Sequence, residues 1–191
     1  AAGDRAALIG RPQAVSGIYG NGLMNNGTHL VDFIRMLCGE VVAVRALGPE
    51  RPLTGLPLAG DAALAGALTL SDGVIAVIQP VDFAHYREIG LDIWGENGRL
   101  EIVHESLTAR HFPRVENRGL DGEFEVASDR PTELPRSVGR ALYRLYDNLA
   151  TALSGSAPLL SPLDNALTDA RLIDTLRRSA ASDGATIRTA A

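Results

Sequence analysis

Alternating apolar and polar residues run through most of residues 40–113, and turn sequences interrupt them at short intervals. Within residues 88–94, for example, every second position is apolar. The turns Ser71-Asp72-Gly73 and Glu96-Asn97-Gly98 are typical of hairpins. A period of two residues indicates strands with one buried face, so this stretch predicts a mostly antiparallel sheet. The strands expected in the whole chain span residues 12–20, 41–47, 62–70, 74–80, 88–94, 99–103 and 107–112.

Apolar residues with helical spacing occur in three places. The first helix is expected over residues 27–37, with Asn26 or Thr28 capping its start and Gly39 ending it. The other two apolar stripes consist of Val138, Leu142, Leu145, Leu149 and Leu153, and of Leu163, Ala166, Leu167, Ala170, Ile173 and Leu176. A strand, a helix, several hairpin strands and two helices predict an α+β fold. We expect a single domain over residues 1–191, an open-faced and mostly antiparallel β-sheet with helices packed on one face.

Two segments between these elements lack a regular pattern. Residues 49–60 contain three prolines and read as a loop, and residues 114–136 are polar and rich in charge. The second segment suits a surface excursion, which leaves open a lid, an arm between subunits or a plain solvated loop. His85, Tyr86 and Trp94 lie in or beside the hairpins, where core or oligomer contacts are expected.

Composition narrows the class of function. The net charge is -5 with acids and bases spread along the chain, which argues against nucleic acid or an anionic membrane as a partner. The chain has no lysine, so it contains no lysine base, and its single cysteine, Cys38, is expected to be a buried small hydrophobe. We see neither a signal peptide nor a membrane span, which fits a cytoplasmic enzyme.

Motifs that bind cofactors are missing from the sequence. No Gly-x-Gly-x-x-Gly and no Walker-type loop occurs, and the four histidines do not have the spacing of a metal site. We therefore predict no metal and no cofactor site of its own. A redox function would need a separate cofactor domain.

Residues 20–39 carry the clearest chemistry, because a glycine-rich polar loop runs directly into the first helix. Loops at helix starts often hold ligands, since free backbone N–H groups point outward there. His29 falls in the first turn, and a neutral imidazole accepts a proton. Asn25 lies four residues earlier, and Asp32, three residues later, is expected to bond the ring or to pair with Arg35. On residue types alone, a solvated or capping histidine remains the commoner alternative.

This segment resembles the signature of the glucose–fructose oxidoreductase, inositol dehydrogenase and rhizopine-catabolism (Gfo/Idh/MocA) family. In that family a glycine-rich loop leads into a helix with the pattern Asp-x-Gly-x-His-x-x-Asp, and here Asn25, Gly27, His29 and Asp32 occupy those positions. Further likeness occurs, in the same order, at residues 9–15, 39–41, 93–100, 161–166 and 179–184. The resemblance covers nearly the whole chain, but only the family's C-terminal domain.

The resemblance implies the substrate-binding and oligomerisation domain of a longer enzyme, without its N-terminal Rossmann domain. NAD or NADP would bind mainly to that missing domain, and the substrate would be a sugar, polyol or cyclitol. His29 and Asn25 would be catalytic, while Asn26, Tyr19 and Asp32 would contact substrate. A homo-oligomer through the sheet face is also expected. Asn25 departs from the family's acid, and because an amide cannot take up a proton, its role is limited to hydrogen bonding.

Two other classes remain open from the sequence. The chain could be a non-catalytic module that oligomerises through its sheet, as the apolar alternation in the hairpins suggests. It could also be a non-redox sugar-binding protein or a hydrolase of cyclitols, and the replacement of the acid by Asn25 favours such a change of chemistry.

Overall fold

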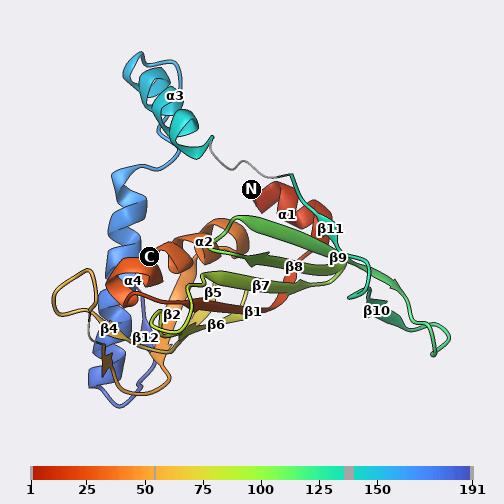
Figure 1. The fold of residues 1–191 in the computed structure, drawn as a ribbon, viewed down its shortest axis with the longest axis horizontal. Helices are drawn as coiled ribbons and strands as arrows, with labels where there is room; N and C mark the ends of the chain where they lie inside the picture. The colour runs from red at the N-terminus through yellow and green to blue at the C-terminus, as the bar shows by residue number, and fades with distance from the viewer. Residues whose placement is uncertain (1, 54, 136–139, 190–191) are drawn as a thin grey trace.

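The computed structural model describes residues 2–53, 55–135 and 140–189. Within them, one large sheet forms the centre of the protein and helices lie against one of its faces (Figure 1). The predicted α+β class, with a mostly antiparallel sheet, is confirmed. The domain description as a unit for substrate binding and oligomerisation stays a prediction.

The sheet formed by the described residues has ten strands, in the order β10-β9-β8-β7-β1-β6-β5-β2-β12, with β11 paired to β9. Its strands are β1 (Pro12–Tyr19), β2 (Val41–Ala46), β5 (Gly66–Leu70), β6 (Ile75–Pro80), β7 (Gly90–Gly95), β8 (Gly98–Val103), β9 (Thr108–Glu116), β10 (Phe124–Val126), β11 (Thr132–Glu133) and β12 (Ile187–Arg188). Two short strands, β3 (Arg51–Pro52) and β4 (Ala62–Ala63), pair with each other. Strand β1 lies in the interior of the sheet, parallel to β6 and antiparallel to β7.

Strands β3 and β12 form where the sequence predicts no strand, and two expected segments also differ. The predicted strand 62–70 is divided into β4 and β5, so that β4 leaves the main sheet and pairs with β3. The expected surface excursion at 114–136 is partly wrong, because β9 continues to Glu116 and both β10 and β11 pair with it. Backbone pairing to β9 satisfies the N–H and C=O groups of a segment whose polar side chains gave no strand signal.

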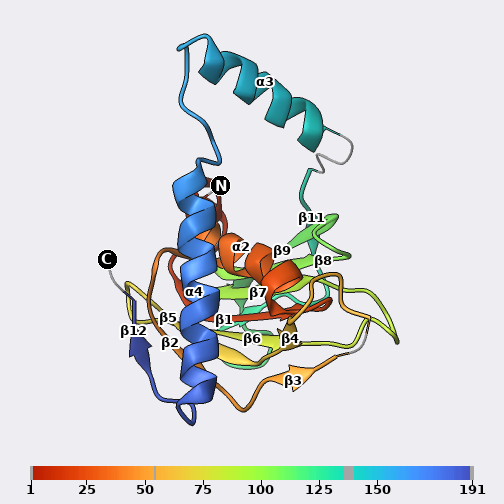
Figure 2. The ribbon, with the colours of Figure 1, turned by 90° about the vertical axis from the view of Figure 1, so that its left-hand side faces the viewer.

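Five helical segments occur in the described residues: α1 (Ala2–Ile9), the π-helix η1 (Leu23–Gly27), α2 (Thr28–Cys38), α3 (Ala141–Leu153) and α4 (Leu163–Ala181). Helix α2 contacts β1 and β7, whereas α4 contacts β2 and β12. Figure 2 shows α4 crossing the front of the sheet with α2 beside it. The two helices also contact each other, and α1 contacts α2, β8 and β9, so the three helices cover one face of the sheet.

Glycines in two strands let these helices approach the sheet closely. A Cβ at Gly17 of β1 would lie 2.8 Å from Leu30 Cδ1 of α2. In the same way, a Cβ at Gly66 of β5 would lie 2.8 Å from Leu176 Cδ1 of α4. Each helix thus seats one leucine on the bare backbone of a strand, and a side chain at either glycine would push the helix outward.

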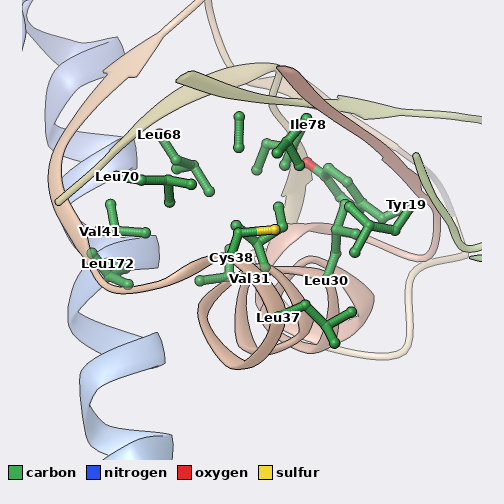
Figure 3. Packing of buried hydrophobic residues seen from close by; sticks show 14 of the residues in the cluster. Tyr19, Leu30, Val31, Leu37, Cys38, Val41, Leu68, Leu70, Ile78 and Leu172 are labelled. Atoms are coloured by element: carbon green, nitrogen blue, oxygen red, sulfur yellow. The ribbon is translucent and has the colours of Figure 1, made fainter. Parts of the chain in front are cut away.

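The hydrophobic core lies between these helices and the sheet (Figure 3). Leu30 and Val31 of α2 meet Ile78 of β6 and Leu68 of β5 in this layer. Cys38 is buried in the same layer, as the sequence predicts, and burial raises the pKa of its thiol to about 11. The cysteine therefore packs as a small apolar side chain.

Helix α3 differs from the prediction that both C-terminal helices pack on the sheet. None of its residues is buried, and Figures 1 and 2 show it standing apart from the other helices. Its apolar stripe is formed as the sequence predicts, but Leu142 and Leu153 are 67% and 81% exposed. Val138, the first residue of the predicted stripe, lies outside the described residues.

The opposite face of the sheet carries charged and aromatic side chains. Asp92 and Trp94 alternate in β7 with residues that pack under the helices, so they point to this open face. Arg99 of β8 donates to both carboxylate oxygens of Asp92, at 2.7 and 2.8 Å, and to Glu101 at 2.9 Å. The same guanidinium lies over the rings of Trp94 and Phe112. The charged side chains of this cluster are 19–27% exposed and paired with one another, and Trp94 is 43% exposed beside them.

His85, Tyr86 and Trp94 are all exposed, so the expectation of core contacts for them is wrong. His85 and Tyr86 lie in the loop between β6 and β7 rather than in a strand. Their side chains therefore have no second layer to pack against. Oligomer contacts by these residues stay a prediction.

Candidate active site at the start of helix α2

The candidate residues begin inside a helical turn, not in the loop that the sequence suggests. Residues Leu23–Gly27 form a π-helix, and the N–H of Gly27 donates to the carbonyl of Gly22 at 3.1 Å, five residues back. Helix α2 follows directly from Thr28. The Thr28 hydroxyl donates to the carbonyls of Asn25 and Met24. Single π turns are frequent at functional sites because they re-aim side chains within a helix.

The predicted caps, Asn26 and Thr28, are wrong. Neither side chain caps the start of α2, because the helical backbone already extends back to Leu23. The acceptor at this start is Asp61, whose carboxylate accepts from the N–H groups of Met24 and Asn25 at 2.9 and 3.2 Å. Asp61 is distant in sequence and follows an irregular loop, so neither spacing nor motif identifies it.

His29 and Asn25 lie on one side of the helix near its start. They are four residues apart, which places them one above the other. The His29 side chain is exposed and Asn25 is partly exposed. Within the described residues, no hydrogen bond or ion pair engages the His29 ring. The imidazole is therefore available to a bound molecule, as is the nearby amide.

Asn26 and Tyr19, the other two expected substrate contacts on this side, are buried. Asn26 lies on the inner side of the π turn and is 9% exposed. Tyr19 ends β1 with its side chain fully buried; its hydroxyl donates to the carbonyl of Leu64 at 2.7 Å and accepts from the N–H of Leu64 at 3.1 Å. Burial raises the pKa of the Tyr19 phenol well above its ordinary value. With its proton committed to the backbone, Tyr19 acts as a core anchor in this structure.

Asp32 does not pair with Arg35, so that expectation is wrong. Arg35 donates to Asp169 of α4 at 2.8 Å and, through two nitrogens, to Glu40 at 2.9 and 3.1 Å. Burial, followed by the negative charges of Asp32 and Glu40, raises the pKa of Asp169, although Arg35 acts against this. The network ties α2 to α4 and leaves the partly exposed Asp32 outside it.

The described residues offer few other sites. No three His, Cys, Asp or Glu side chains lie together there as a metal ion would require. Among the described helices, none combines the length and the apolarity needed to cross a membrane. The exposed side of η1 and α2 thus carries His29, Asn25 and Asp32. The buried Asp61 supports the backbone beneath them.

Residues 9–101 match the family model described as the GFO/IDH/MocA C-terminal domain. This part of the chain is similar to a GFO/IDH/MocA C-terminal domain. The match includes β1, η1, α2 and the strands up to β8, and therefore every candidate site residue. Among curated protein sequences, none matches the chain.

Solved oxidoreductase structures share the fold of this chain. Levoglucosan dehydrogenase in complex with NADH and levoglucosan superposes with a TM-score of 0.70 at 18% identity, over 98% of this chain and 61% of that one. An NAD binding oxidoreductase from Klebsiella pneumoniae gives 0.72 at 14% identity, over 98% and 61%. An oxidoreductase from Agrobacterium radiobacter in complex with NAD+, L-tartaric acid and magnesium gives 0.67 at 15% identity, over 96% and 58%.

The chain thus spans about three fifths of the length of these oxidoreductases. Identities of this size establish the shared fold and do not carry a substrate across. The positions of His29 and Asn25 at the start of a helix under the sheet come from this chain's own structure.

Proposed function

We propose that the chain is the substrate-binding and oligomerisation domain of an NAD(P)-dependent oxidoreductase acting on a sugar, polyol or cyclitol. The observation that carries the proposal is the exposed, unengaged His29 imidazole one turn from Asn25, within the matched domain. The nicotinamide complexes of levoglucosan dehydrogenase and of the Agrobacterium radiobacter oxidoreductase support the redox class. Levoglucosan and L-tartaric acid in those structures support a hydroxyl-bearing substrate.

The cofactor does not fit this chain alone. The sequence has no glycine fingerprint for a pyrophosphate, and we propose that a separate nucleotide-binding domain holds NAD or NADP. Hydride chemistry belongs to the nicotinamide. The residues of this chain supply the other half of the reaction, which is to hold the substrate hydroxyl and to handle its proton.

His29 is the proposed acid–base residue. In the direction of oxidation, its neutral imidazole accepts the proton of the substrate hydroxyl as the C–O bond gains double-bond character, and in reduction it returns that proton. Asn25 donates its side-chain N–H to the same oxygen or accepts from a neighbouring hydroxyl. Because Asn25 cannot ionise, it orients the substrate without adding a charge beside His29.

Asn26 and Asp32 have smaller proposed roles. Asp32 is partly exposed beyond His29 along α2 and accepts from substrate hydroxyls there. Asn26 is nearly buried, so we propose that it supports the π turn next to the substrate and contributes at most one edge of its amide. Tyr19 is left out of the substrate contacts, since its hydroxyl proton is held by Leu64.

The test uses the oxidoreductase that joins this domain to its nucleotide-binding domain, assayed with NAD+ and NADP+ against a panel of sugars, polyols and cyclitols. His29→Ala should lower kcat by about a hundredfold or more while cofactor binding persists. His104→Ala, on the turn between β8 and β9, is the control and should retain activity. Unchanged kcat in His29→Ala would remove His29 from the mechanism.

A second experiment addresses the missing cofactor site. Titration calorimetry of the 191-residue chain with NADH should detect no binding in the micromolar range. Micromolar binding would contradict the assignment of the cofactor to another domain.

A non-catalytic role in assembly is the second candidate, favoured by the open face of the sheet. The cluster around Arg99 presents both acidic and basic groups, and Trp94 is 43% exposed beside it. Such a face can pair with a copy of itself across a two-fold axis. Sedimentation of the wild type and of Trp94→Glu would test this, and a monomeric wild type would overturn it.

A further inference from the structure

The buried carboxylate of Asp61 holds the backbone of the residues that carry the candidate site. It accepts from Met24 N at 2.9 Å, from Asn25 N at 3.2 Å and from Ala62 N at 2.8 Å. Asp61 is 8% exposed. The first N–H groups of a helix have no acceptor within the helix, and the helix dipole favours a negative charge at this end. A carboxylate from another part of the chain meets both needs here.

The chain makes room for this carboxylate at Gly22. A Cβ on Gly22 would lie only 2.0 Å from Asp61 Oδ2, and Gly22 has a φ of +92°, which side chains disfavour. The glycine before η1 therefore serves two purposes, a backbone turn and a seat for Asp61. A side chain at this position would displace the carboxylate from the N–H groups that it holds.

Both backbone polar groups of Asn25, its N–H and its carbonyl, are hydrogen-bonded. Asp61 accepts from its N–H, and the Thr28 hydroxyl donates to its carbonyl. The segment that carries Asp61 is itself anchored in the core, because Leu64, three residues later, exchanges two hydrogen bonds with the hydroxyl of Tyr19. The anchor runs from the end of β1 through Leu64 and Asp61 to the backbone of Asn25.

We propose that Asp61 is a positioning residue that sets the direction of the Asn25 side chain relative to His29. This inference rests on the proposed function, because the direction of the Asn25 amide matters for substrate only if Asn25 contacts it. Asp61 touches no substrate: it fixes the π turn, and the π turn aims the amide. Its negative charge matters as well as its shape, because both carboxylate oxygens accept hydrogen bonds and neither donates.

Amide hydrogen exchange of the isotopically labelled full chain, followed by NMR, tests this directly. In Asp61→Ala, amide exchange at Met24 and Asn25 should accelerate about tenfold to a hundredfold. This factor corresponds to the free energy that a hydrogen bond to a charged group contributes to keeping an amide closed. Asp61→Asn keeps one acceptor oxygen, so it should protect one of these two amides and release the other. The Asn25 side-chain N–H signals should move toward averaged positions in Asp61→Ala.

Two further variants separate positioning from general stability. Gly22→Ala keeps Asp61 but places a methyl group where its carboxylate lies. This variant should reproduce the loss of exchange protection at Met24 and Asn25. Asp72→Asn changes a carboxylate that accepts from Val74 N in an exposed turn, and should leave Met24 and Asn25 unchanged. If exchange in Asp61→Ala accelerates equally at core amides such as Ile93, Asp61 acts only on stability and the proposal fails.

The outcome for Asp61 is distinguishable from that for the proposed function. The exchange measurement reads the position of the backbone and needs neither substrate nor cofactor. If His29→Ala stayed active, the proposed catalytic role of His29 would be refuted, but the exchange result for Asp61 would be unaffected. Conversely, unchanged Met24 and Asn25 amides in Asp61→Ala would overturn the positioning role and leave His29 untouched.

Discussion

Helices α2 and α3 have similar lengths, 11 and 13 residues, and both carry an apolar stripe, but the fold treats them differently. Five residues of α2 are buried, whereas none is buried in α3. The difference lies outside the helices. Strand β1 offers Gly17 as a seat for Leu30, while no strand or helix of the described residues offers such a seat to α3.

This comparison shows what an amphipathic pattern encodes. The pattern of α3 specifies a helix with a face that gains free energy on burial, and it leaves the partner of that face unspecified. For α2 the partner surface is strand β1 of the same chain, where Gly17 leaves room for Leu30. The predictions below measure how far the two helices differ.

The largest expected difference concerns one leucine from each helix. Leu30→Ala in α2 should lower the free energy of unfolding by about 3 kcal/mol, because it leaves a cavity over Gly17. Leu145→Ala in α3, where the side chain is 53% exposed, should change it by less than about 0.5 kcal/mol. Urea unfolding of both variants measures the pair. Equal losses would mean that α3 is packed in solution.

Thiols on α2 and α3 should react with an alkylating reagent at different rates. Cys38 is buried in α2 with its pKa raised to about 11, so near pH 8 it holds about a hundredfold less thiolate than a cysteine of ordinary pKa. Leu145→Cys in a Cys38→Ala background presents a thiol on α3 as the matched probe. Alkylation by iodoacetamide should be at least about a hundredfold slower at Cys38. Similar rates would show that α2 opens readily.

The glycine seat can be tested from the side of the strand. Gly17→Ala introduces a Cβ 2.8 Å from Leu30 Cδ1 and should destabilise the protein by about 1–3 kcal/mol through overpacking. Gly119→Ala, with its nearest atom at 3.9 Å and no positive φ, is the control and should be nearly neutral. A neutral Gly17→Ala would indicate that α2 moves outward without cost, and the contrast with α3 would shrink.

The smallest effect concerns the contact between α2 and α4. Burial raises the pKa of Asp169, so above the ordinary value of 3.8 the folded state binds more proton than the unfolded state. The free energy of unfolding should therefore fall as the pH rises from 3.8 toward the raised value. Asp169→Asn should remove this part of the slope, and Asp147→Asn on α3 is the matched control. An unchanged slope in Asp169→Asn would contradict the assignment.

Most of the fold is predictable because its signals are local. Alternation and turn sequences predict β5 to β8 as hairpin strands, and the helical periods predict α2, α3 and α4. The strands β10 and β11 are not predictable in this way, since their polar side chains give no period and only pairing with β9 defines them. The exposure of α3 is not predictable either, because burial depends on a partner that no local pattern names.

In the candidate site, too, some features have local sequence signals and others depend on distant contacts. His29 and Asn25 follow from their position at the start of a helix and from the family signature. The π turn, the Asp61 carboxylate and the pairing of Arg35 with Asp169 depend on contacts between residues far apart in sequence. The interior position of Tyr19 also depends on the distant Leu64 backbone, which provides both hydrogen-bond partners for its hydroxyl.

The π turn has a consequence for how such a site can change over generations. Its hydrogen bond joins Gly27 to Gly22, one residue further back than in an α-helix. Loss of a single residue from this turn would restore ordinary helical spacing and rotate whatever precedes it by about 100° relative to His29. The core beneath α2 would keep its leucines in place. A one-residue deletion or insertion would thus exchange the group presented beside the histidine, so the surroundings of His29 can change in evolution without rebuilding the fold.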